Sequence, residues 1–152
     1  MEHKRLILIR HAHRDTGNHI LDNGLSDKGN KQVKLLLRFA HTRELENAVY
    51  FTSPKKRCVE TITPLAKEFG ARVTIENALD EGCSISQLDA FIDHWKLYGA
   101  GLTVACSHGD VIPMLVEKLT GGMISIKKAG WCEIELVGRD CYLTWLVQKY
   151  ES

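Results

Sequence analysis

Two apolar runs of the sequence end in residues that can do chemistry. The run at 6–9 leads into Arg10 and His11, and the run at 104–106 leads into Ser107 and His108. A guanidinium is a fixed cation with a planar fork of donors, which suits phosphate or carboxylate. A neutral imidazole is a nucleophile or a proton carrier near pH 7. Together these residue types indicate phosphoryl chemistry.

Strands and helices alternate along the chain, and they must position these residues. Apolar runs predict strands at about 5–10, 48–52, 71–76 and 102–107, the first three followed by helical stretches. A helix after the fourth strand should run to Gly121-Gly122, and two β-rich runs at 131–137 and 141–147 predict a hairpin or late antiparallel strands. The residues with helical spacing are Val33, Leu36, Leu37 and Ala40, then Leu88, Phe91, Ile92 and Trp95, then Val111, Leu115 and Leu119.

Four residues indicate where helices begin or are disturbed. Ser26 and Ser53 stand where N-caps belong, and Pro54 suits the first position of a helix. Pro64 lies well inside the helix that follows the second strand. Because proline has no backbone N–H to donate, we expect a kink or a break there.

The alternation predicts the fold class. We expect a single three-layer α/β/α domain over residues 1–152, with a mostly parallel central sheet, helices on both faces and late antiparallel strands. In such sheets the ligand crevice lies outside the carboxyl ends of the strands. The candidate site residues that follow the strand ends are Arg10, His11, Arg57, Asp80, Glu81 and His108.

Composition narrows the class of protein further. A chain of 152 residues with 44% apolar and 26% charged residues fits one ordinary globular domain. The net charge of +1 gives no general reason to expect a nucleic-acid or membrane partner. The five cysteines are odd in number and lack the spacing of metal ligands, and the N-terminal segment reads as neither a signal peptide nor a membrane span. We therefore expect a cytoplasmic protein.

Four motifs, in order along nearly the whole chain, resemble those of the histidine phosphatase superfamily, or phosphoglycerate-mutase-like fold. LILIRHA at 6–12 is similar to the opening strand with Arg-His-Gly, and 25–29 is similar to the Leu-Thr-x-x-Gly turn. The segment 53–61 matches Ser-Pro-x-x-Arg-x-x-x-Thr, and 107–109 matches the late Ser-His-Gly. The short chain resembles the small bacterial phosphohistidine phosphatases of this superfamily.

The resemblance implies a role for each matching residue. His11 is the nucleophile that carries the phosphoryl group, and water then releases it. Arg10, Arg57 and His108 bind the phosphate and stabilise the charge of the transition state, so that no metal or other cofactor is expected. The family commonly takes its general acid from a carboxyl group after the third strand; Glu81 is the candidate and Asp80 the second choice.

The match departs from the family pattern after His11. Ala12 stands where glycine is commoner, and we expect it to be tolerated. His13 occupies a position where many members have Glu, and Asn18 falls one place later than the family's phosphate-binding Asn. Asn18 and Arg14 are candidate substrate-binding residues, while His13 and Arg14 either line the pocket mouth or are solvated. The Lys127-Lys128 pair is predicted to form a solvated turn.

Two substrate classes and two rival functions remain open at this point. The chain has little room for insertions that would cap the pocket, so an open pocket could admit phosphohistidine on a protein. If Glu81 is a true acid, a small phosphomonoester fits equally well. The main rival is a non-catalytic module of the same fold that binds phosphate or a phosphoprotein. A metal site built from His11, His13 and His108 is disfavoured, because residues two apart on a strand point to opposite faces. The sequence leaves the oligomeric state and the pathway open.

Overall fold

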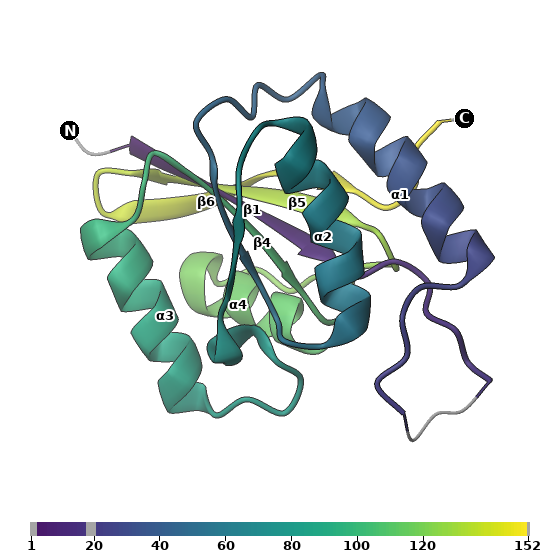
Figure 1. Cartoon of the computed structure of the whole chain (residues 1–152). Coiled ribbons are helices and arrows are strands. Elements are labelled where there is room, and N and C mark those ends of the chain that lie inside the picture. Colours follow the sequence, from purple (N-terminus) through teal and green to yellow (C-terminus); the bar gives the residue numbers. More distant parts are fainter. Residues whose placement is uncertain (1–2, 18–20, 152) are drawn as a thin grey trace.

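The computed structural model describes residues 3–17 and 21–151. Within these ranges, helices and strands alternate as far as α4, and two strands then close the chain (Figure 1). The elements are β1 (His3–Arg10), α1 (Asp27–Ala40), β2 (Val49–Thr52), α2 (Lys56–Glu68), β3 (Val73–Ile75), the short 3-10 helix η1 (Asn77–Leu79), α3 (Ile85–Tyr98), β4 (Leu102–Ser107), α4 (Val111–Thr120), β5 (Trp131–Val137) and β6 (Asp140–Val147).

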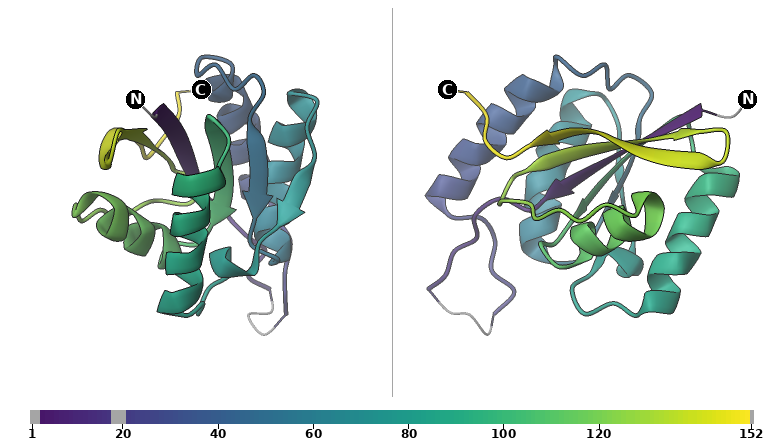
Figure 2. Two further views of the ribbon diagram at one scale, coloured as in Figure 1. Left: turned by 90° about the vertical axis from the view of Figure 1, so that its left-hand side faces the viewer. Right: turned by 180° about the vertical axis from the view of Figure 1, so that it is seen from behind.

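The six strands form one sheet in the order β3-β2-β4-β1-β5-β6. The first four are mutually parallel, while β5 runs antiparallel to both β1 and β6. Helices α1 and α2 pack on one face and α3 and α4 on the other, which Figure 2 shows from the side and from behind. The prediction of a three-layer α/β/α domain with late antiparallel strands is confirmed.

Strand β1 runs through the centre of the core. Leu6 and Leu8 pack into the apolar cluster under α3 and α4, while Ile7 and Ile9 pack into the cluster under α1 and α2. A strand buried on both faces needs apolar residues at every position rather than an alternating pattern. The polar residue that ends β1, Arg10, therefore emerges at the carboxyl edge of the sheet, beside Ser107 at the end of β4.

The predicted N-cap is correct for α1 and wrong for α2. Ser26 is the N-cap of α1, and its hydroxyl accepts from Gly29 N at 3.1 Å, as predicted. The prediction for Ser53 and Pro54 is wrong, because α2 begins at Lys56 with Lys55 at its N-cap. The hydroxyl of Ser53 instead faces an imidazole of the site described below.

Pro64 does not break α2, which continues from Lys56 to Glu68, so of the predicted kink or break the break is wrong. A proline costs the helix one backbone donor and its hydrogen bond. The buried face of α2, which includes Ile62, Leu65 and Ala66, anchors the turns around it to the sheet. No helix of the described residues is long and apolar enough to cross a membrane.

Candidate active site

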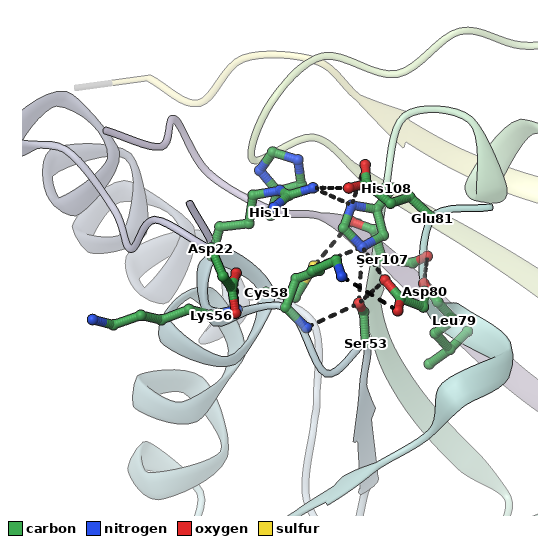
Figure 3. Close-up of polar contacts among 12 residues, drawn as sticks. His11, Asp22, Ser53, Lys56, Cys58, Leu79, Asp80, Glu81, Ser107 and His108 are labelled. Atoms are coloured by element: carbon green, nitrogen blue, oxygen red, sulfur yellow. Dashed lines mark hydrogen bonds and ion pairs between the residues drawn. The ribbon is translucent and has the colours of Figure 1, made fainter. Parts of the chain in front are cut away.

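The carboxyl ends of β1, β2 and β4 bring the candidate residues together. Backbone hydrogen bonds continue past the strand ends, from His11 N to Ser107 O at 3.0 Å and from Ser53 N to Cys106 O at 3.0 Å. His11, Ser53 and His108 therefore leave three adjacent strands at one edge. Asp80 and Glu81 approach the same place from the loop after η1, as Figure 3 shows.

His11 is buried, and its protonation state follows from its contacts. Its side-chain Nδ1 lies 2.8 Å from the carbonyl oxygen of Ala12. Because a carbonyl only accepts, Nδ1 carries the proton and the lone pair of Nε2 is free. Burial lowers the pKa of His11 to about 3, helped by the charges of Arg57, His108 and Arg10 and opposed by the Ala12 hydrogen bond. His11 is thus neutral at physiological pH, and a backbone carbonyl holds its ring proton.

Two buried groups face His11 across the edge. The ring centroid of His108 lies 5.4 Å from that of His11, with the rings inclined at 62°. The Arg57 guanidinium is buried in the first turn of α2, and its Nη2 lies 3.5 Å from His108 Nδ1. Thr61 ties this helix to the end of β1, since its hydroxyl accepts from Ala12 N at 2.9 Å and donates to Arg57 O at 2.7 Å. The Arg-x-x-x-Thr spacing therefore places Arg57 beside the residues that follow β1.

Arg10 is held close to the backbone of two loops. Its Nη1 donates to Ile126 O at 2.7 Å, and its buried Nε has no hydrogen-bond partner among the residues that the structure describes. A Cβ atom at Gly109 would lie 2.7 Å from Cζ of Arg10, so only glycine lets the loop after β4 approach the guanidinium this closely. Burial lowers the pKa of Arg10, which Asp110 partly opposes, but a guanidinium still carries its charge at physiological pH.

Glu81 forms an ion pair with Arg57, in which Oε1 lies 2.8 Å from Nη2. Its second oxygen, Oε2, lies 3.9 Å from Nδ1 of His108. Burial raises the pKa of Glu81, but the hydrogen bond and charge of Arg57 and the charges of His108 and Lys55 outweigh it, so the net pKa is lowered. Glu81 is therefore ionised at neutral pH in this state of the molecule.

Asp80 lies on the other side of His108. Its Oδ1 is 3.8 Å from Nε2 of His108 and 3.5 Å from Ser53 Oγ, and its Oδ2 is 3.6 Å from Lys55 Nζ. The Ser53 hydroxyl is closer to His108, with 2.8 Å between Oγ and Nε2 (Figure 3). Ser53 thereby orients the imidazole of His108, a role that the sequence analysis missed. The signal for it was the Ser-Pro pair directly after β2.

Cys58 was also missed, because its sequence context is that of a small buried hydrophobe. Its Sγ lies 3.6 Å from His108 Nε2. Burial raises the pKa of its thiol, but hydrogen bonds from Cys106, His108 and Ser53 and the charge of His108 prevail and lower it to about 6. Cys58 is therefore, together with Ser53, one of the polar groups that contact Nε2 of His108.

The segment after His11 is held against the start of α1. His13 Nδ1 lies 2.6 Å from Ser26 Oγ, and a Cβ at Gly29 would lie only 2.0 Å from the carbonyl oxygen of His13. Gly29 is thus the glycine that this close approach requires. Ala12 is buried and does not have a positive φ, so the methyl group is tolerated here.

The structure brings five of the predicted site residues together at one edge of the sheet. They are Arg10, His11, Arg57, Glu81 and His108. Arg14 lies at the margin of this group, where it forms an isolated antiparallel bridge with Leu25, and Asn18 lies outside the described residues. Among the described residues, no three or more His, Cys, Asp or Glu side chains are grouped to hold a metal ion.

A hollow of about 550 Å³ lies elsewhere, between α3 and the β2–β4 part of the sheet. Its lining includes Phe51, Phe91 and Trp95 but none of the five residues above. We assign the chemistry to the strand ends because the neutral imidazole and the buried guanidinium converge there.

Comparison with known proteins agrees with this geometry. The family model of the histidine phosphatase superfamily (branch 1) matches residues 6–84, and this chain belongs to that superfamily. The matched stretch includes Arg10, His11, Arg57 and Glu81. A search of the curated proteins found no match.

Solved structures share the fold at low sequence identity. The protein histidine phosphatase SixA complexed with tungstate superimposes with a TM-score of 0.83 at 13% identity, over 95% of this chain and 96% of that one. A putative α-ribazole-5'-P phosphatase from Escherichia coli gives 0.80 at 15% identity, over 98% of each chain. The mycobacterial glucosyl-3-phosphoglycerate phosphatase Rv2419c in complex with VO3 gives 0.75 at 15% identity, over 95% of this chain and 98% of that one.

Proposed function

We propose that this protein is a metal-independent phosphatase that works through a phosphohistidine intermediate on His11. Its substrate is phosphohistidine on a protein or a small phosphomonoester. The observation that carries the proposal is the buried, neutral imidazole of His11, whose Nδ1 proton is held by Ala12 O while Arg10, Arg57 and His108 surround it. An uncharged nucleophile beside fixed cations is what attack on a phosphate dianion requires.

In the first step, Nε2 of His11 attacks phosphorus. The N–P bond forms as the bond from phosphorus to the leaving group breaks, and the electron pair of that bond stays with the leaving group. Arg10, Arg57 and His108 stabilise the charge on the three equatorial oxygens. The Ala12 carbonyl stabilises the positive charge that develops on the ring, because it already holds the Nδ1 proton.

In the second step, water attacks phosphorus and the N–P bond breaks. Inorganic phosphate leaves as dihydrogen phosphate, which keeps the oxygen and both protons of the attacking water, and the electron pair of the N–P bond returns to Nε2, which restores neutral His11. The same three side chains serve this step, because its transition state carries the same distribution of charge.

Glu81 can protonate a leaving oxygen only if substrate changes its surroundings. Without substrate, the carboxylate of Glu81 is paired with the Arg57 guanidinium, to which a substrate phosphate would also bind. A phosphate that takes over Arg57 removes the contact that lowers the pKa of Glu81 and brings negative charge beside it. Both effects raise the pKa of Glu81, so that it takes up a proton when substrate binds.

A non-catalytic binding module would use the same phosphate-binding residues, Arg10, Arg57 and His108, but would show no turnover. Every group that the two chemical steps use is present at the site, which favours the enzyme. The phosphorylated compound or protein is the partner that the function implies. The five thiols are unpaired in the structure, and we place the protein in the cytoplasm, where thiols stay reduced.

Hydrolysis of an aryl phosphate should persist in excess EDTA and be inhibited competitively by vanadate. The arginines supply the positive charge that a metal supplies in other phosphatases, and vanadate adopts the trigonal-bipyramidal geometry of the transition state. Two structures of similar fold hold the related oxyanions tungstate and VO3. A steady-state assay with and without chelator tests this. Loss of activity on chelation, restored by a divalent ion, would overturn the metal-independent mechanism.

Glu81→Gln should damage hydrolysis of an alkyl phosphomonoester by ~10²–10⁴-fold, the usual contribution of a general acid. p-Nitrophenyl phosphate should lose much less, because nitrophenolate leaves without a proton, and the basic limb of the pH–rate profile should disappear. Measuring kcat/KM on both esters and on phosphohistidine tests this, with Asp80→Asn as the matched carboxylate variant. Equal, small losses on all three substrates would remove Glu81 from the chemistry and favour the phosphohistidine substrate.

A further inference from the structure

The loop at 126–130 is fastened to the end of β1. Arg10 N donates to Gly130 O at 3.1 Å, Ala129 N donates to His11 O at 3.1 Å, and the Arg10 side chain donates to Ile126 O at 2.7 Å. Ala129 is buried and has a φ of 61°, a left-handed conformation that costs energy in a residue with a Cβ. The loop is therefore held in a defined shape around Arg10 and His11. Lys127 and Lys128 do form a turn, and Lys127 is exposed as predicted, but Lys128 is partly buried.

Lys128 is placed beside Arg10 by these contacts. Its side chain is partly buried, while the neighbouring Lys127 is exposed. Burial lowers the pKa of Lys128, and the charges of Arg10, Arg14 and Lys28 lower it further. The ammonium group thus lies among like charges.

The start of α1 is also fastened to the residues that follow β1. Lys28 lies in the first turn of α1, and Ser26 ties that turn to His13 through its hydroxyl and through its backbone N–H, which donates to His13 O at 3.0 Å. Arg14 follows directly and pairs with Leu25. Burial and the charges of Lys128 and Lys28 lower the pKa of His13, in agreement with this arrangement. We call Arg14, Lys28 and Lys128 the cationic collar.

The collar lacks an acidic partner among the described residues. In the described part of the chain, none of its three members forms an ion pair. The nearest acidic residues in the sequence are Asp15, which accepts from Gly17 N, and Asp27, which is exposed in the first turn of α1. The carboxylates of the site, Asp80 and Glu81, contact Lys55, Arg57 and His108 instead.

Holding like charges together costs energy, and a single phosphate does not account for all of them. The reacting phosphate is already served by Arg10 and Arg57. The cationic collar adds further cations without ion-pair partners, one of them partly buried in a fixed loop. Such a group is suited to a second negative charge on the same substrate.

We propose that the cationic collar binds a second anionic group, a carboxylate or a second phosphate, carried by a small phosphomonoester substrate, and that Lys128 determines this specificity. This inference rests on the proposed function and narrows its substrate class. The reacting phosphate lies against Arg10, Arg57 and His108, and the second anion lies toward the loop at 126–130 and the start of α1.

Three substrates of one chain length test the proposal: propyl phosphate, 3-phosphooxypropanoate and propane-1,3-diyl bisphosphate. The wild type should hydrolyse at least one of the two substrates with an anionic tail with a kcat/KM about tenfold above that of propyl phosphate, mainly through a lower KM. Lys128→Gln should reduce that preference by about fivefold, and Lys128→Arg should restore most of it. Lys127→Gln, the exposed neighbour, is the matched control and should retain the preference. Which of the two acidic substrates is favoured identifies the second anion.

The outcomes separate this inference from the proposed function. Hydrolysis of propyl phosphate by the wild type tests the phosphatase alone. Binding of the bisphosphate and of propyl phosphate to the His11→Ala variant, measured by calorimetry, tests the collar without turnover. A wild type that shows no preference in either assay, or a preference that Lys127→Gln and Lys128→Gln reduce equally, would overturn the proposal.

Discussion

Replacing His11 by Ala is expected to lower kcat/KM for an aryl phosphate by ~10⁴-fold or more. Loss of a covalent nucleophile removes the reaction path itself, and such losses in other enzymes are of this size or larger. The remaining cations would still bind phosphate, so the affinity for phosphate should change much less than the turnover. Steady-state kinetics together with phosphate binding measured by calorimetry check both parts.

The control for this variant is His94→Ala, which removes an exposed histidine on α3. It should retain wild-type turnover. Thermal unfolding should show that the His11 variant is folded, since its buried neighbours His108 and Arg57 hold one another through separate contacts. Substantial turnover in a folded His11→Ala protein would contradict the assignment of the nucleophile.

Arg57→Ala is expected to lower kcat by ~100-fold or more, the usual result of removing one preorganised donor to a transition-state oxygen. The guanidinium is buried and fixed by Glu81 and His108, so it needs little reorganisation when the charge develops. Lys56→Ala is the matched control, because Lys56 is the preceding residue of α2 and is exposed. An effect confined to KM would mean that Arg57 only recruits substrate.

The central strands could be predicted because burial on both faces of the sheet requires an uninterrupted run of apolar residues. Leu6 to Ile9 are buried on both faces, and the polar residue that follows such a run must leave the core at the edge of the sheet. Ser26 could be predicted as an N-cap because the capping interaction is local. The strand predicted at 71–76 is longer than β3, Val73–Ile75, which lies at the edge of the sheet and pairs with β2 alone among the described strands.

Contacts between distant segments account for what the sequence could not predict. Ser53 looks like an N-cap, but the imidazole of His108, 55 residues away, occupies its hydroxyl. Lys128 looks like part of a solvated turn, but its loop is bonded to the backbone of Arg10 and His11. The Glu81–Arg57 ion pair joins the loop after η1 to the first turn of α2, and their approach depends on the packing of η1 and α2. Sequence patterns identified the residue types at the site, whereas their pairing follows from the tertiary structure.

Rapid quench with a ³²P-labelled substrate tests the central claim most directly. The account predicts transient label on His11 that is labile in acid and stable in base, as a phosphoramidate is, and that appears before inorganic phosphate is released. The label should be absent from the His11→Ala variant. Label on a serine or on any other residue, or turnover with no labelled protein at any time, would contradict a phosphohistidine intermediate on His11.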